Sequence, residues 1–233
     1  MNLIIIRPEE LSDGLVRISD PRFTHIQKYL KPEKGSRLKA GVLNGHIGTA
    51  EVIDITDSYA ELRFTPEKEP PAPHKISLIL ALPRPKVFRR MLFSAVSIGV
   101  KDIHIINSWR VEKSYWDSPY ISAESVDKVC IEALSQCKDT VMPDVTFHRF
   151  FNNFIDEALP MMPEERSRYI AHPYSENSFK PCEPAIIAIG PEGGFIDKEL
   201  DTFTGRGFVP FTIGERVLTS EHFIPFVLGS VIN

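Results

Sequence analysis

Cysteine is scarce in this chain of 233 residues, and its three cysteines form no pattern that binds a metal ion. Cys130 and Cys137 lie seven residues apart in a stretch with helical periodicity, and Cys182 stands by itself. The sequence has no CxxC pair and no HExxH segment. An odd, sparse set of cysteines is typical of a reducing compartment, so we expect buried, unreactive thiols and no metal site.

Long apolar runs are also missing. The stretch up to Ile6 is apolar, but it has neither the basic segment nor the cleavage site of a signal peptide, so it predicts a strand. No stretch of the sequence approaches the length that is needed to span a bilayer. With 42% hydrophobic and 25% charged residues, the composition is typical of a soluble globular protein, and we expect a cytoplasmic one.

An overall excess of positive charge is absent, because the net charge is −4. The basic residues are nevertheless gathered in two places. Residues 17–39 hold seven lysines and arginines against Asp20 and Glu33, and residues 84–90 hold four with no acidic residue among them. Solvated surface charge and local contact with phosphate groups both remain open for these clusters.

A proline-rich segment divides the chain. Residues 65–75 carry four prolines, which fix φ and cannot donate a hydrogen bond to a neighbouring strand. We therefore predict a linker here and two domains, residues 1–70 and 71–233.

The first part of the chain reads as short strands with one helix. Asn44-Gly45 predicts a tight hairpin turn, and apolar residues at helical spacing predict a helix over residues 22–30. The β-branched or alternating segments are residues 3–6, 37–44, 46–55 and 59–64. Several short strands and one helix in about 65 residues predict a small β-barrel.

The second part alternates strands with helices. Strands are predicted over residues 77–82, 102–107, 168–172, 185–190 and 208–213. Helices are predicted over residues 87–95 and 122–137, from Asp197 as a cap to Gly205, and from Ser220 onward. This alternation predicts an α/β domain with a parallel sheet.

Two glycine turns follow predicted strands. The segment GPEGG at residues 190–194 leaves one strand and precedes a helix, which is where ligands bind in open α/β sheets. It has neither the GxGxxG spacing of a dinucleotide site nor the Lys-Ser/Thr pair of a phosphate loop. The segment IGERVLTSE at residues 213–221 repeats the arrangement, so the two turns can line one pocket. The alternatives are a plain turn and a structural ion pair between Arg216 and Glu221.

Together these segments resemble the RsmE family of uridine-N3 methyltransferases of small-subunit ribosomal RNA, within the SPOUT superfamily. The resemblance covers nearly the whole chain. It is carried by RFTHIQKYLKPEKGSRL, ALPRPKVFRRMLFSAVSIGV, EALSQCKDTVMPDV, AIGPEGGFIDKEL and FTIGERVLTSEHF.

This resemblance implies a PUA-like, RNA-recruiting barrel followed by an α/β domain with a deep trefoil knot. It implies a homodimer that acts on ribosomal RNA or the small ribosomal subunit, with S-adenosylmethionine as cofactor. The implied cofactor-binding residues are Leu82, Ala171, His172, Pro173, Ile189, Gly190, Pro191, Glu192, Gly193, Gly194, Ile213, Gly214, Val217 and Leu218.

The resemblance also implies roles in catalysis and in RNA binding. Glu221 and Arg216 are the predicted catalytic residues, with His222 and Glu192 as other groups near enough in sequence to take the N3 proton. The predicted RNA-binding residues are Arg7, Arg22, His25, Lys28, Lys31, Arg84 and Lys86. Tyr115 and Trp116 could stack on a base, or serve as a subunit contact or as packing.

The chain departs from the family at several charged positions. Ser97 replaces a glutamate, and Asp139 and Thr219 replace arginines, whose planar fork of donors they cannot reproduce. We interpret the chain as a divergent member that keeps its cofactor while its target nucleotide can differ. A methyltransferase for another RNA site and a catalytically silent knotted RNA-binding protein are the alternatives.

Overall fold

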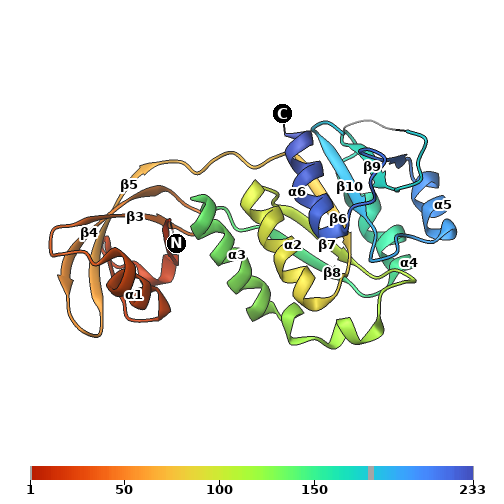
Figure 1. The fold of residues 1–233 in the computed structure, drawn as a ribbon. Coiled ribbons are helices and arrows are strands. Elements are labelled where there is room, and N and C mark those ends of the chain that lie inside the picture. Colours follow the sequence, from red (N-terminus) through yellow and green to blue (C-terminus); the bar gives the residue numbers. More distant parts are fainter. Residues whose placement is uncertain (1, 178–180, 233) are drawn as a thin grey trace. The chain divides into compact units, whose positions relative to one another are not determined.

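The structure is a computed structural model that describes residues 2–177 and 181–232. The chain forms two compact units (Figure 1). The first comprises the chain up to Ala72 together with Ile131–Met142, and the second comprises Pro73–Cys130 and the chain from Pro143 onward. The division falls within helix α3 (Ala123–Cys137), a feature that a single cut near residue 70 does not capture.

The first unit is built on a five-stranded sheet in the order β1-β3-β4-β5-β2. Its strands are β1 (Ile4–Ile6), β2 (Leu15–Ile18), β3 (Arg37–Val42), β4 (Ile47–Ile55) and β5 (Ala60–Lys68). Strands β1 and β3 are parallel, and the other pairs are antiparallel. Asn44 adopts a positive φ of 58° between β3 and β4, which confirms the predicted tight turn.

A short helix packs against this sheet. It consists of α1 (Pro21–His25), which Asp20 caps, and a wider turn, η2 (Ile26–Leu30). Phe23 and Ile26 are buried among the alternating apolar residues of the strands. Burying one face of the helix and one face of the sheet in a common core stabilises both.

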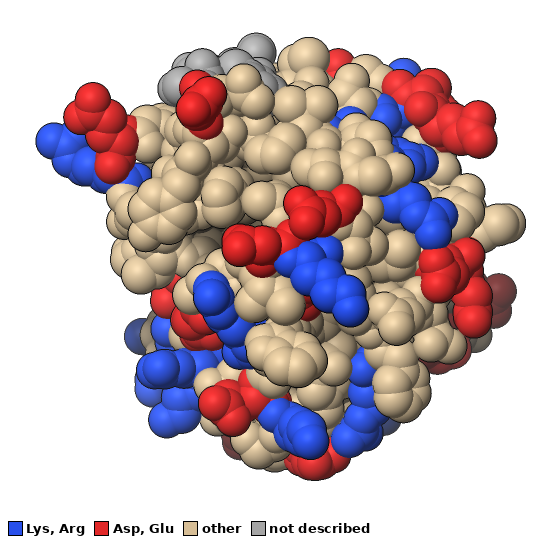
Figure 2. All heavy atoms as spheres, turned by 90° about the vertical axis from the view of Figure 1, so that its right-hand side faces the viewer, with Lys and Arg blue, Asp and Glu red and all other residues tan. Residues whose placement is uncertain are grey.

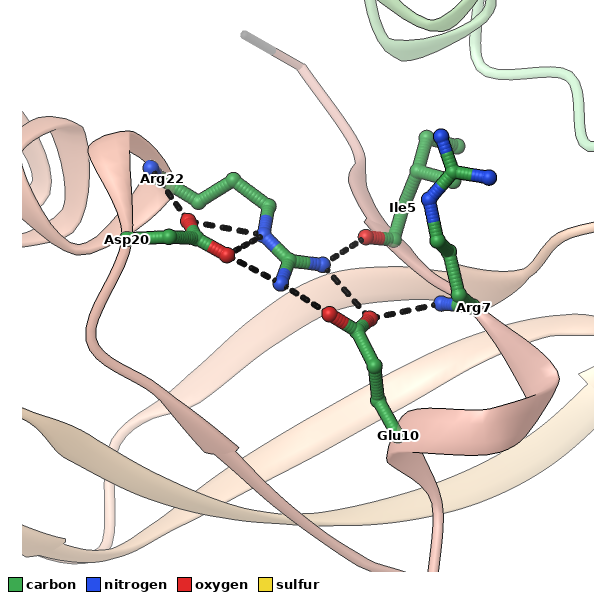
Figure 3. Close-up of polar contacts among 5 residues, drawn as sticks. All are labelled: Ile5, Arg7, Glu10, Asp20 and Arg22. Atoms are coloured by element: carbon green, nitrogen blue, oxygen red, sulfur yellow. Dashed lines mark hydrogen bonds and ion pairs between the residues drawn. The ribbon is translucent and has the colours of Figure 1, made fainter.

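Arg22 ties this helix to the start of the chain (Figure 3). Its guanidinium donates to the Ile5 carbonyl at 2.7 Å and to both oxygens of Glu10, at 2.8 and 2.5 Å. It also pairs with the Asp20 carboxylate, and the Arg7 N–H donates to Glu10 at 2.7 Å. Burial alone would raise the pKa of Glu10 and of Asp20, but the hydrogen bonds from Arg22 lower both.

The C-terminal half of α3 is part of the first unit through hydrogen bonds. Ser135 is buried, and its hydroxyl donates to the Leu3 carbonyl at 2.6 Å. The Thr140 hydroxyl donates to the Gly45 carbonyl at 2.5 Å, and the Asn44 N–H donates to the Thr140 carbonyl at 2.7 Å. These bonds anchor the segment after α3 to the β3–β4 turn.

The second unit contains a six-stranded sheet in the order β11-β9-β10-β6-β7-β8, and all its strands are parallel. The strands are β6 (Ile76–Ala81), β7 (Asp102–Ile106), β8 (Asp144–His148), β9 (Ser167–Ala171), β10 (Ala185–Ile189) and β11 (Val209–Phe211). Every residue of β6 and β10 is buried, which confirms the interpretation of these apolar runs as central strands.

Helices connect these strands. They are α2 (Pro85–Ile98), α3, α4 (Phe151–Asn153), α5 (Asp197–Gly205) and α6 (Ser220–Val231). Short turns lie at η1 (Pro8–Glu10), η3 (Lys113–Asp117), η4 (Pro119–Ile121), η5 (Phe154–Ala158) and η6 (Leu159–Met161). Helices α2 and α6 lie side by side (Figure 1). Within the described part of the chain, no helix is long and apolar enough to cross a membrane.

Some predicted boundaries were wrong. Strand β5 runs to Lys68 and pairs Pro66 with Gly48, so the first residues of the expected linker are strand. Asp197 is the first residue of α5 and Ile196 its cap, because the Glu199 side chain already binds the Ile196 N–H. The sequence patterns missed β2 and β8.

The expectation of buried cysteines is wrong for Cys182, which is exposed, and Cys137 is only partly buried, but the expectation holds at Cys130. Its side chain is buried, and burial raises the pKa of the thiol to about 12. A thiol with such a pKa is not a nucleophile at neutral pH.

We predict that the Arg22 network makes the stability of the first unit fall in acid. The folded state lowers the pKa of Glu10 and Asp20, so their contribution is present above about pH 5 and is lost as pH falls below about 4. Arg22→Ala should destabilise the unit by about 1–3 kcal/mol at pH 7.

Urea unfolding between pH 3 and 7 measures both effects. Glu10→Gln should reduce the fall in unfolding free energy at acid pH. Glu9→Gln, which changes an exposed neighbour in η1, should leave that fall unchanged. Equal curves for Glu10→Gln and wild type would contradict the assignment.

Candidate functional site

A cavity of about 380 Å³ lies at the carboxyl ends of strands β9, β10 and β11. This volume is in the range of small-molecule sites. It is lined by Ala171, His172, Pro173, Tyr174, Ile189, Gly190, Pro191, Glu192, Gly193, Gly194, Phe211, Thr212, Ile213, Arg216, Val217, Leu218, Thr219, Ser220 and Phe223. Three chain segments therefore form its walls: the loop after β9, the loop after β10, and the connection from β11 into α6.

The loop after β10 folds back tightly. A Cβ on Gly190 would lie 3.0 Å from the Phe195 nitrogen, so any larger residue would require the backbone of the loop to shift. Gly193 and Gly194 adopt positive φ angles of 93° and 75°, and the Gly194 N–H donates to the Pro191 carbonyl at 2.9 Å. Glycine is required here both for close approach and for backbone conformation.

The loops after β9 and β11 are joined to each other. The His172 N–H donates to the Phe211 carbonyl at 2.9 Å, and the Ser175 hydroxyl donates to the Pro210 carbonyl at 3.0 Å. From α6, Ser220 donates to the Gly190 carbonyl at 3.3 Å. All three walls are thus connected by hydrogen bonds.

The structure brings together all but two of the predicted cofactor-binding residues at this cavity. Leu82 does not line it: its N–H extends the β6–β7 ladder to the Ile106 carbonyl, and its side chain is buried in the core. Gly214 is the other residue outside the lining, although its φ of 146° makes the bend that the loop needs.

The two predicted catalytic residues are not equivalent. Arg216 lines the cavity. Glu221 does not, and its carboxylate instead accepts two hydrogen bonds from Arg90 of α2, one at 2.8 Å. These bonds hold the pKa of Glu221 below its ordinary value, which makes it a weaker base. His222 Nδ1 lies 2.8 Å from the Thr219 hydroxyl oxygen.

Glu199 connects the loop after β7 with the loop after β10. Its carboxylate is buried and accepts hydrogen bonds from the Trp109 N–H at 2.8 Å, the Ser108 hydroxyl at 3.3 Å and the Ile196 N–H at 3.0 Å. Sequence reasoning did not single out Glu199, although its place three residues after the helix cap is typical of a capping glutamate.

Basic side chains stand beside the cavity. Arg110 donates a hydrogen bond to the Gly193 carbonyl, and Arg84 Nε lies 3.8 Å from the Glu192 carboxylate. Lys86 follows in the first turn of α2. Of the predicted RNA-binding residues, Arg84 therefore lies at the cavity rim.

The other predicted RNA-binding residues belong to the first unit. Arg22 binds within the protein, so its donors are already engaged. The Lys28 ammonium lies 5.4 Å from the centre of the exposed Tyr29 ring, the His25 ring lies 5.0 Å from it, and Lys31 ends the same helix. In Figure 3 the Arg7 guanidinium points away from the Glu10 carboxylate.

Charge is mixed over the face of the second unit shown in Figure 2. Lysine and arginine side chains alternate with aspartate and glutamate, and uncharged areas lie between them. This mixture of signs agrees with the slightly negative net charge of −4. A polyanion would therefore be bound by local basic groups and not by a large positive surface.

The three departures from the expected family pattern lie in different surroundings. Asp139 is buried and accepts the Val141 N–H at 2.9 Å. Thr219 lines the cavity. The Ser97 hydroxyl is buried without a hydrogen-bond partner in the described structure, where a glutamate would need a partner.

His104 lies in a polar cluster that occupies both of its ring nitrogens. Its Nδ1 lies 3.0 Å from His148 Nε2, and its Nε2 lies 3.0 Å from the Asp102 carboxylate, which Arg166 also approaches. Burial and the neighbouring His104 lower the pKa of His148. Among the described residues, no group of three or more histidines, cysteines and carboxylates is placed to hold a metal ion.

Comparison with known proteins gives a consistent result. Residues 70–230 match the family model described as the RNA methyltransferase domain. The chain is 29% identical over 231 residues to ribosomal RNA small subunit methyltransferase E of Treponema pallidum, covering 95% of this chain and 86% of that protein. It is 27% identical to methyltransferase E 1 of Borreliella burgdorferi, covering 95% and 93%.

A solved structure shares the fold. Ribosomal RNA small subunit methyltransferase E from Neisseria gonorrhoeae, bound to S-adenosyl methionine, superposes with a TM-score of 0.73 at 21% identity, covering 98% of this chain and 95% of that one. At this identity the likeness concerns the fold.

We predict that Glu199→Ala loosens the loop after β7. Removing the carboxylate leaves the Trp109 N–H and the Ser108 hydroxyl without acceptors, which should cost about 1–3 kcal/mol. Hydrogen exchange at Trp109 should accelerate strongly. The control is Asp197→Ala, which removes an exposed carboxylate from the same helical turn and should leave that exchange rate unchanged.

Proposed function

The chain belongs to the RNA methyltransferase domain family, and from this membership we propose that it is an S-adenosylmethionine-dependent methyltransferase of small-subunit ribosomal RNA. We further propose N3 of a uridine as the methylated atom. The observation that carries the proposal is the cavity formed by two glycine loops at the carboxyl edge of the parallel sheet.

The residues at the cavity fit such a cofactor. Its walls offer apolar side chains from Ile189, Phe211 and Leu218 beside backbone groups of the glycine loop. Gly190 and Gly193 let a flat ring approach the backbone closely, and a Cβ at Gly190 would crowd the Phe195 nitrogen at 3.0 Å. A nucleoside that carries a methionyl chain on a sulfonium is served by this combination of apolar surface and backbone donors and acceptors.

When bound, the cofactor supplies a methyl group already activated on a sulfonium. The protein is then left with positioning and with proton transfer. The glycine loop and the connection from β11 to α6 align the donor, while Arg84 and Arg110 at the rim attract the phosphates that flank the target base. Transfer of the methyl group to N3 requires that the N3 proton leave to a base.

Glu221 and Arg216 stay predictions for the catalytic step. Arg216 lines the cavity and can stabilise negative charge that develops on the uracil ring as the proton leaves. Glu221 can accept the proton only when Arg90 releases it, because the bound arginine lowers its pKa. His222, on the same helical turn, is the alternative acceptor.

The first unit is proposed to be a PUA-like barrel that recruits RNA. The basic helix that carries His25, Lys28 and Lys31 supports this role, because His25 and Lys28 lie close to the exposed ring of Tyr29. The second unit is proposed to contain a trefoil knot and to form a homodimer. The position of β11 outside β9, with the Asn177 carbonyl accepting the Thr212 N–H at 2.9 Å, is compatible with a chain end that passes the β9–β10 connection.

Deleting the gene and mapping the ribosomal RNA by mass spectrometry tests the reaction. We expect the loss of one methyluridine from small-subunit rRNA and its return when the gene is restored. An unchanged modification map would refute the rRNA assignment, and loss of a different methylated nucleotide would refute N3 of uridine.

We predict that Gly193→Val abolishes binding of S-adenosylmethionine. Valine cannot adopt the φ of 93° without strain, so the loop must change shape. Calorimetry on the folded variant measures the loss. Gly207→Val is the matched control, because Gly207 has a similar φ of 84° but does not line the cavity, and it should bind like wild type. Normal binding by Gly193→Val would place the cofactor elsewhere.

A further inference from the structure

We propose that Trp109 is the residue on which an unstacked pyrimidine base of the RNA substrate stacks beside the cavity. This inference rests on the proposed methyltransferase function and adds a residue that determines how the target strand is held. From the sequence, Tyr115 and Trp116 were the candidates for stacking. In the structure Trp109 is the exposed tryptophan.

The indole of Trp109 is presented to solvent by a rigid turn. The Val111 N–H donates to the Ser108 carbonyl at 3.0 Å, and this bond closes a turn with Trp109 and Arg110 at its corner. Ser108 and Val111 are buried at its two ends, whereas the Trp109 side chain is 81% exposed. A large aromatic side chain on a fixed backbone binds a planar partner with little loss of conformational entropy.

Buried Glu199 holds this turn in place beside the cofactor loop. It accepts the Trp109 N–H and the Ser108 hydroxyl, and it also accepts the Ile196 N–H at the end of the Gly190–Gly194 turn. The Arg110 guanidinium donates to the carbonyl of Gly193, which lines the cavity. Arg110 therefore connects the turn directly to the cavity wall, and Glu199 connects Trp109 to the backbone that follows the wall.

Neighbouring charge favours a nucleotide over an apolar partner. Arg110 is next to the indole in the chain, and Arg84 stands at the rim with 70% of its side chain exposed. Cationic groups for phosphates beside an exposed aromatic ring for a base are the combination by which proteins bind single-stranded RNA. Trp109 stacks on no aromatic ring of the described residues, and with 81% of the residue exposed its indole is open to a partner.

Trp116 does not offer such a surface. Its Nε1 donates to the Asn107 side-chain oxygen at 3.1 Å, and its ring meets Phe147 edge to face at 6.5 Å. The two tryptophans of the chain thus have separate roles: Trp116 packs, and Trp109 is presented outward. This difference also makes Trp109 a usable fluorescent reporter.

The first experiment measures stacking without catalysis. In Trp116→Phe, which leaves Trp109 as the single indole, a short oligouridylate should quench the tryptophan emission. An abasic oligonucleotide of equal length has the same phosphates without bases and should quench little. Equal quenching by both would assign the effect to phosphate binding and overturn the proposal, as would no quenching by either.

The second experiment uses methyl transfer to small ribosomal subunits from a strain that lacks the gene. Trp109→Ala should raise KM for the subunit by about 10-fold, as expected for the loss of one stacked base, and leave S-adenosylmethionine binding unchanged. Trp109→Phe should restore most of the affinity because phenylalanine also stacks. An unchanged KM for Trp109→Ala would overturn the proposal.

Two further outcomes separate this inference from what it rests on. If wild type transfers no methyl group while oligouridylate still quenches Trp109 selectively, the proposed reaction fails and the stacking role stands. If Trp109→Ala changes the sedimentation coefficient of the protein, the ring is a subunit contact and the stacking role is overturned.

Discussion

The six strands of the second unit are all parallel, and this constraint determines where its site can form. Parallel strands place all their carboxyl ends at one edge, so the loops after β9, β10 and β11 must meet there. No single one of these three loops could form the cavity alone. The hydrogen bonds from His172 and Ser220 to neighbouring loops turn this meeting into a single walled site.

Carboxylates organise the basic and loop residues of this chain. Glu10 and Asp20 hold Arg22, Glu221 holds Arg90, and Glu199 holds the turn that carries Trp109. In a protein with a net charge of −4, an arginine near a predicted binding surface is therefore often engaged by its own chain. At the rim of the cavity, Arg84 Nε lies 3.8 Å from the Glu192 carboxylate and Arg110 donates to the Gly193 carbonyl, and each guanidinium has further N–H donors for a ligand.

The departures from the expected family pattern are explained in part by packing. Asp139 is buried in the first unit and accepts a backbone N–H there, as the nearby Ser135 donates to a backbone carbonyl, so its carboxylate stabilises the fold. The Ser97 hydroxyl has no such partner in the described structure. Loss of a charged residue at these positions is thus compatible with an intact cavity, because the glycine loops that form it do not involve them.

The sequence by itself determined the parallel α/β architecture, the Asn44 turn and both glycine loops, because apolar periodicity and glycine placement are local signals. It could not determine that Leu82 points into the core, that Glu221 faces Arg90, or that Ile131–Met142 joins the first unit. These depend on residues far apart in the chain meeting in three dimensions. The exposure of Trp109 was likewise not predictable from the sequence. Nothing in its local sequence distinguishes it from a buried aromatic residue, and its exposure follows from the turn that Glu199 holds in place.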